Sequence, residues 1–207
     1  MTKTDIWRIV HGERRALAAE LHAISDEQWA LPTACSAWTV RDVVAHMATT
    51  ATVSPATFFP RWLASGFSLR RMQDRGMATE RGTSPADTLA RFEAVVGSNR
   101  PPGAADTLLG ETLVHAEDVR RALGLRHDYP MGAVVRVADR YKDSSLAAGS
   151  KHRIAGLRLR STDATWSWGE GPEVVGPMMA LLLAMTGRKA ALSDLTGEGA
   201  EELRRRA

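Results

Sequence analysis

The sequence predicts a mainly α protein, in which a four-helix bundle is followed by a small α+β C-terminal domain. Within residues 1–130, four segments carry apolar residues at the spacing of three and four that is typical of helices. Alternating apolar and charged residues, typical of half-buried strands, follow only after residue 150. A chain of 207 residues is long enough for two such domains, and we place the boundary between residues 1–130 and 131–207.

Composition and charge exclude several classes of protein. The formal charge of +3 is scattered along the chain and does not interleave with aromatic residues, so we expect no nucleic-acid partner. Cys35 is the single cysteine, which excludes an intramolecular disulfide and fits a reducing cytoplasm. The longest apolar run, Met178–Met185, is far shorter than the ~20 residues of a membrane span. We therefore expect a soluble, cytoplasmic protein without a membrane partner.

The first two bundle helices are indicated by apolar periodicity and by a capping pattern. The first is expected over residues 4–24. The second should begin at Thr39, with Asp42 three residues later in a near match to a capping box. Pro55 should end or kink this helix, and 57–64 resumes its pattern.

The next segment, Arg70–Gly82, is polar and contains glycine, so we expect a mobile loop there. The third helix should then start at Ser84, with Pro85 in the first helical position, and stop near Gly97. The fourth is predicted over residues 106–123 and is ended by a glycine.

The C-terminal domain should combine helices with two strands. Met131–Ala148 is expected to form one helix that leads into it. Strands are predicted over Arg153–Arg160 and Ala164–Trp168. An apolar helix, Pro177–Thr186, and an amphipathic helix, Ala191–Arg206, interrupted at Gly197–Gly199, should complete the chain.

A candidate metal site emerges from the predicted second and fourth helices. Glu111 and His115 are four residues apart, so they share one helix face and could chelate one ion. His46, on the second helix, is the candidate third ligand. Histidine and carboxylate ligands suit zinc, and nickel, iron and manganese stay open as alternatives. Three protein ligands leave a position open, as in catalytic sites.

Other interpretations of these residues stay open. Glu111 and His115 could form only a hydrogen bond on the helix surface, and His46 could be an ordinary core histidine. Cys35 lies just before a helix N-terminus and could be a nucleophile, a fourth ligand or a partly buried loop residue. Asp118, one turn after His115, could orient that imidazole or pair with an arginine.

Three segments of the sequence resemble the mycothiol-dependent maleylpyruvate isomerase family, which belongs to the DinB-like group of metal-binding four-helix bundles. The first is TACSAWTVRDVVAHM, and the second, much later in the chain, is ETLVHAEDVRRALG. The third, similar to the small C-terminal domain of those enzymes, is VVGPMMALLLAMTGRKAALSDLTGEGAEELR. The resemblance covers most of the chain, with both domains in the expected order.

The resemblance implies that His46, Glu111 and His115 bind a divalent metal, with zinc as the expected ion. It also implies mycothiol as the thiol cofactor, which would use the open metal position. The expected activity is isomerisation or thiol S-transfer on a small electrophile. A non-catalytic metal-binding or regulatory module is the alternative. The sequence does not identify the electrophile.

Two features bear on how far the resemblance extends. Ser36 and Ala37 stand where family members often have Pro-Gly, which changes the turn before the second helix. Arg188, near the C-terminal domain's apolar helix, is a candidate catalytic residue that could bind a carboxylate of the substrate or thiol bidentately. It could equally complement the dipole at the end of that helix.

Overall fold

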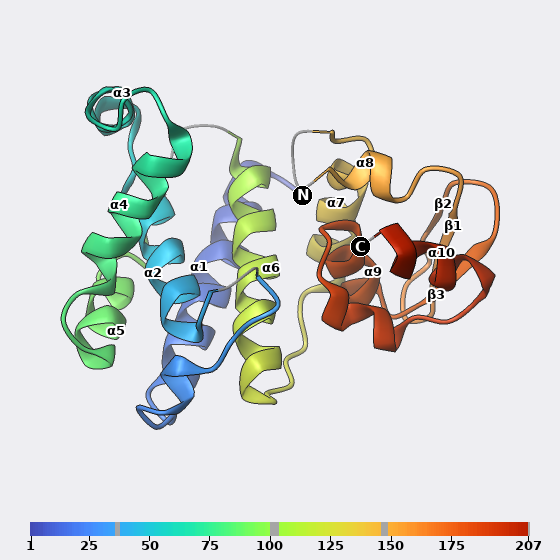
Figure 1. Cartoon of the computed structure of the whole chain (residues 1–207), viewed down its shortest axis with the longest axis horizontal. Coiled ribbons are helices and arrows are strands. Elements are labelled where there is room, and N and C mark those ends of the chain that lie inside the picture. Colours follow the sequence, from blue (N-terminus) through green and yellow to red (C-terminus); the bar gives the residue numbers. More distant parts are fainter. Residues whose placement is uncertain (36–37, 100–103, 146–148, 207) are drawn as a thin grey trace. The chain divides into compact units, whose positions relative to one another are not determined.

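The structure, a computed structural model, describes residues 1–35, 38–99, 104–145 and 149–206. The chain forms two compact units, Met1–His127 and Asp128–Ala207. It is mainly helical, with a small sheet near the C-terminus, so the predicted fold class is confirmed (Figure 1). Ser36 and Ala37 lie outside the described residues. Among the helices described, none combines the length and the apolar character needed to cross a membrane.

The four predicted bundle helices form a closed arrangement in the N-terminal unit. Helix α6 contacts α1 and α2, and α5 contacts the same two helices, so each of the four touches two others (Figure 1). The helical elements of this unit are α1 (Lys3–Leu21), η1 (Gln28–Ala30), α2 (Val40–Thr52), α3 (Pro55–Ala64), α4 (Leu69–Arg81), α5 (Pro85–Glu93) and α6 (Ala105–Leu123).

Capping residues set the helix boundaries largely as the sequence predicts. The Asp42 amide donates to Oγ1 of Thr39 at 3.2 Å, and the Thr39 amide donates to Oδ2 of Asp42 at 3.0 Å, so the capping box is complete. Ser84 caps α5 by accepting from the Asp87 amide, whereas the Asp87 carboxylate accepts from the Thr83 amide and so does not complete a capping box. Helix α5 nevertheless ends at Glu93, before the predicted end near residue 97.

The core of the bundle joins all four helices in one apolar cluster. Each helix contributes residues at three- and four-residue spacing, which is the pattern that predicted it. The buried members are Leu17, Ala18, Leu21, Trp29, Val40, Val43, Val44, Met47, Ala48, Leu89, Phe92, Ala116 and Val119.

The prediction of a mobile loop over Arg70–Gly82 was wrong, because Leu69–Arg81 is helix α4. It was missed because none of its side chains is buried, so the segment has no apolar stripe. The helix nevertheless packs along α2. Gly76 makes this approach possible, since a Cβ there would lie 2.3 Å from Cγ2 of Thr49.

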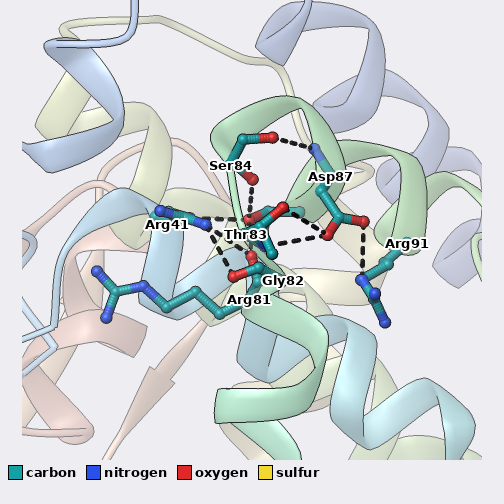
Figure 2. A network of polar contacts seen from close by, with 8 residues as sticks. Arg41, Arg81, Gly82, Thr83, Ser84, Asp87 and Arg91 are labelled. Carbon is teal, nitrogen blue, oxygen red and sulfur yellow. Dashed lines mark hydrogen bonds and ion pairs between the residues drawn. The ribbon is translucent and has the colours of Figure 1, made fainter.

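Polar contacts fasten the end of α4 to the start of α2. The Arg41 guanidinium donates to the carbonyl oxygens of Arg81 at 2.9 Å and Gly82 at 3.2 Å (Figure 2). In return, the Arg81 guanidinium pairs with the Asp42 carboxylate at 3.0 Å. These contacts hold α4 in register with α2, which matters for the site described below.

The C-terminal unit surrounds one apolar helix. Helix α9 is buried almost throughout, as expected for a helix that is apolar on all sides, and it packs on α7, η2 and the sheet. The elements of this unit are α7 (Met131–Tyr141), α8 (Ser150–Arg153), β1 (Arg158–Ser161), β2 (Ser167–Trp168), β3 (Glu173–Gly176), α9 (Met178–Met185), η2 (Lys189–Asp194) and α10 (Glu198–Arg206).

Several element boundaries in this unit differ from the prediction. The helix predicted over 131–148 ends at Tyr141, and residues 146–148 lie outside the described residues. The first strand begins only at Arg158. The interruption expected in the last helix is present, between η2 and α10, and lies two residues earlier than predicted. Strand β3 was missed. It pairs in parallel with β1, whose other edge pairs antiparallel with β2.

A buried ion network links α1 to α6. The Arg120 side chain is fully buried, and its Nε donates to Oε2 of Glu20 at 2.7 Å. Its Nη1 lies 3.3 Å from Oε2 of Glu13, which His127 also contacts at 2.9 Å. A buried charge that loses its partner is strongly destabilising, so this network depends on each of its members.

We predict that Arg120→Met lowers the free energy of unfolding by about 3 kcal/mol, because it leaves buried carboxylates without their arginine. This value is at the lower end of the range that is usual for removing one partner of a buried ion pair, because His127 stays beside Glu13. Urea unfolding measures the change. The control is Arg121→Met, which removes a more exposed pair with Glu117 and should cost less than about 1 kcal/mol. Equal effects of the two variants would contradict this interpretation.

We also predict that Gly76→Ala destabilises the N-terminal unit by about 1–3 kcal/mol through overpacking against Thr49, despite the higher helix propensity of alanine. Adding Thr49→Ser removes the clashing methyl group and keeps the hydroxyl, which donates to the Ala45 carbonyl. The double variant should regain most of the loss in urea unfolding. A Gly76→Ala protein as stable as the wild type would show that α4 does not pack this closely.

Candidate metal centre

The three predicted ligands lie together in the N-terminal unit. Nε2 of His46 is 3.2 Å from Oε2 of Glu111, and Nε2 of His115 is 3.4 Å from the same oxygen. All three ligand atoms lie within 4.8 Å of one another. One carboxylate oxygen therefore faces two imidazole nitrogens.

The packing of α2 against α6 produces this arrangement. Glu111 and His115 are one turn apart on α6, and His46 faces them from α2. The side chains of His46 and His115 are only 4% and 9% exposed, whereas that of Glu111 is 37% exposed. Solvent or a small molecule can therefore reach the three candidate ligands from the side on which Glu111 lies.

Asp118 orients His115 from the opposite side of the ring. Its fully buried Oδ2 lies 3.1 Å from Nδ1 of His115. The arginine considered as an alternative partner, Arg121, pairs with Glu117. A carboxylate at this position accepts a hydrogen bond from Nδ1–H and directs Nε2 toward a metal. This arrangement is typical of zinc-binding histidines.

Gln73, on α4, contacts the other histidine. Its side-chain Nε2 lies 3.0 Å from Nδ1 of His46. No sequence pattern indicated this contact, because residues 70–82 were expected to form a loop and a single glutamine belongs to no motif. The capped α2 and the glycine in α4 are the features that bring Gln73 to this position.

Trp38 packs against the two imidazole rings. Its ring centroid is 4.9 Å from that of His46 and 6.1 Å from that of His115. The imidazoles themselves meet edge to face, with centroids 4.8 Å apart. This packing restricts the rotation of both rings, so the ligand geometry is fixed before any ion binds.

Burial and hydrogen bonding shift the pKa values of Glu111 and His115 in opposite directions. Burial alone would raise the pKa of Glu111, but contacts with His115 and His46 outweigh it and hold this pKa well below its ordinary value. Burial would lower the pKa of His115, but hydrogen bonds to Asp118, Cys35 and Glu111 raise it well above 6.5. The pair thus favours an imidazolium facing a carboxylate.

The donor atoms also fit a metal ion. In a tetrahedral zinc site with bonds of about 2.0–2.1 Å, neighbouring ligand atoms stand about 3.3–3.4 Å apart. The separations of 3.2 and 3.4 Å around Glu111 match this spacing. The same distances also suit hydrogen bonds from the two imidazoles to Glu111.

Cys35 belongs to a second group of candidate ligands. It is half-buried, and its sulfur, His115 and Asp118 offer ligand atoms within 4.8 Å of one another. His115 is thus shared between two sets of residues. Cys35 is a neighbour of the candidate centre, and its role stays open.

Arg188 lies in the C-terminal unit, immediately after α9. It is half-buried, and its Nη1 donates to the carbonyl oxygen of Thr186 at 3.4 Å. This contact at the end of a helix agrees with the dipole interpretation and leaves the catalytic one untested. Its role stays a prediction.

A cavity of about 200 Å³ lies beside His46, between α2, α3 and α4. His46 and Gln73 form part of its wall, together with apolar groups from Val53 and Met72 and the cationic Arg61. Glu111 and His115 are not among its lining residues. The cavity therefore adjoins the Gln73 side of the imidazole.

Comparisons with known proteins agree with the resemblance seen in the sequence. Residues 10–100 match the family model described as the mycothiol maleylpyruvate isomerase N-terminal domain. No curated protein has a sequence that matches the chain. Residues 10–100 are therefore similar to the N-terminal domain of this family, and the predicted resemblance is confirmed over this segment.

Two solved structures share the fold over nearly the whole chain. One is the mycothiol-dependent maleylpyruvate isomerase, with a TM-score of 0.68 and 14% identity. The other is a His-to-Ala mutant of such an enzyme, with a TM-score of 0.67 and 15% identity. Each covers 97% of this chain and 94% of its own. At these identities the likeness establishes the common fold of both units.

The pKa shifts predict how the stability of the metal-free protein depends on pH. The lowered pKa of Glu111 stabilises the fold above pH 4.5, and this contribution is lost as the pH falls. The raised pKa of His115 stabilises the fold below pH 6.5, and this contribution is lost as the pH rises through the raised value.

We therefore expect Glu111→Gln to cost most stability between pH 4.5 and 6.5 and less on either side. Urea unfolding with a chelator present, across this pH range, measures the difference from wild type. Glu117→Gln, on the same helix, is the control. A cost that does not vary with pH would show that Glu111 and His115 are not paired in this way.

Proposed function

We propose that this chain is a metal-dependent enzyme that uses mycothiol to isomerise a small electrophile or to transfer a thiol to it. The observation that carries the proposal is the convergence of His46 and His115 on one oxygen of Glu111. The match of residues 10–100 to the mycothiol maleylpyruvate isomerase N-terminal domain supports it. The fold shared with isomerase structures over both units supports it.

The donor set supports zinc as the ion. Two imidazole nitrogens and one carboxylate oxygen are typical of catalytic zinc sites. When bound, zinc would supply an open coordination position and favour the thiolate form of a thiol held there. Asp118 would keep His115 in the required tautomer, and Trp38 would hold both rings in place.

Exposure indicates where the reactants would approach. The buried histidines close one side of the group, and the half-exposed Glu111 leaves the other side accessible. The related structures are named for maleylpyruvate, and we propose a substrate of the same general class, a small electrophilic molecule. Arg188 is our candidate for binding a carboxylate of the substrate or of the thiol. A reducing cytoplasm is the expected location of such chemistry.

A second candidate function is a non-catalytic metal-binding module. It is favoured by one observation, the proximity of Cys35 to His115 and Asp118. A thiolate from the protein could then occupy the position that a thiol cofactor needs. Cys35→Ser distinguishes the two functions, because it should spare turnover of an enzyme but change the metal affinity of a module that uses this sulfur.

We predict that His46→Ala abolishes both zinc binding and mycothiol-dependent turnover, because two remaining ligands hold the ion weakly. Elemental analysis of the purified protein gives the metal content, which should be one ion per chain in the wild type. Conversion of a panel of small electrophiles with mycothiol present measures turnover, and thiol consumption distinguishes transfer, which uses up the thiol, from isomerisation, which returns it. His152→Ala, an exposed histidine in the C-terminal unit, is the control. Undiminished metal content and turnover in His46→Ala would refute the proposal.

A further inference from the structure

The contacts of His46 define which of its nitrogens carries the proton. A neutral imidazole has one N–H donor and one acceptor nitrogen. The amide NH₂ of Gln73 can only donate, so Nδ1 of His46 accepts at 3.0 Å. Nε2 then carries the proton and donates to Oε2 of Glu111 at 3.2 Å. The two contacts are consistent with one tautomer.

Metal binding requires the other tautomer. The nitrogen that faces Glu111 and His115 is Nε2, and a metal binds through the lone pair of that atom. The proton must then reside on Nδ1, which needs an acceptor in place of the Gln73 NH₂ group. The amide of Gln73 carries such an acceptor, Oε1, on the same terminal carbon.

We propose that Gln73 is a positioning residue that serves both tautomers of His46. Its NH₂ group donates to Nδ1 in the metal-free protein, and its Oε1 accepts from Nδ1–H when the metal is bound. The exchange needs only a half-turn of the amide about its terminal bond. This inference rests on the proposed metal site.

His115 shows why a glutamine differs from a carboxylate at this position. Asp118 accepts from Nδ1 of His115 and cannot donate when ionised, so Nδ1 keeps its proton throughout and only the proton on Nε2 has to leave when a metal binds. Gln73 is neutral and can do both. His46 is thus the adjustable ligand of the pair, and His115 is the fixed one.

The surroundings of Gln73 keep it near His46 and leave its amide room to turn. Gly76, one helical turn further along α4, lets this helix approach α2 closely, and the contacts between Arg81 and α2 fix its end (Figure 2). Gln73 also borders the cavity of about 200 Å³ beside His46. The amide can therefore rotate without displacing packed side chains.

Two substitutions separate this role from a structural one. Gln73→Met keeps the size and removes both hydrogen-bonding groups, so zinc affinity should fall by about 10- to 100-fold, as is usual for groups that orient a ligand. Gln73→Glu keeps an acceptor, so zinc affinity should be retained or increased. Asp74→Met, on the exposed side of α4, is the matched control and should bind zinc like the wild type.

The protonation of the His46 nitrogens is the measurement that distinguishes the two roles. It would not change in a Gln73 variant if Gln73 only supported the packing of α4. Nitrogen-15 NMR of the metal-free protein should show Nδ1 without a proton in the wild type and with one in Gln73→Glu, while Nε2 keeps its proton toward Glu111 in both. Chelator competition gives the zinc affinities. Wild-type affinity in Gln73→Met, or an Nδ1 that still lacks a proton in Gln73→Glu, would overturn the inference. If the wild type binds no zinc, the proposed function fails, and the change in Nδ1 protonation alone decides whether Gln73 governs His46.

Discussion

The packing of α2 against its neighbours is the constraint on which the site depends. Helix α2 contacts α4, α5 and α6, and its buried apolar residues form the middle of the bundle core. His46 lies among these residues, so an imidazole is placed in an apolar environment. Such burial is costly unless both ring nitrogens have partners. Glu111 on α6 and Gln73 on α4 are those partners, one from each side.

Helix α6 combines the site with the most deeply buried ion network in the same unit. Glu111, His115 and Asp118 occupy its middle, and Arg120 follows within one turn. The charges of His115 and Arg120 are each compensated by carboxylates, so the helix carries buried charge without an unpaired group at these positions. Arg120 fixes α6 to α1. The positions of Glu111 and His115 on α6 therefore do not depend only on the contacts that these two side chains make.

Local features of the structure could be predicted from the sequence, and contacts between distant segments could not. Thr39 and Ser84 cap their helices through residues three positions away, so a short pattern suffices to locate these ends. The pairing of Glu111 with His115 is equally local. The approach of His46 to them depends on how two helices pack, and the family resemblance, rather than spacing, indicated it. Helix α4, strand β3 and Gln73 were missed because neighbours far along the chain stabilise them.

Helix α4 contributes no buried side chain, and neither does the preceding α3. Separation of these two helices from α2 would therefore expose less apolar surface than unfolding of the four-helix core, so its free energy should be lower than that for unfolding the whole unit. Amide protons of α4 should exchange with solvent through such local openings while those of α1 and α6 remain protected. The face of His46 that carries Nδ1 would then become accessible to water by a fluctuation that leaves the four-helix core intact.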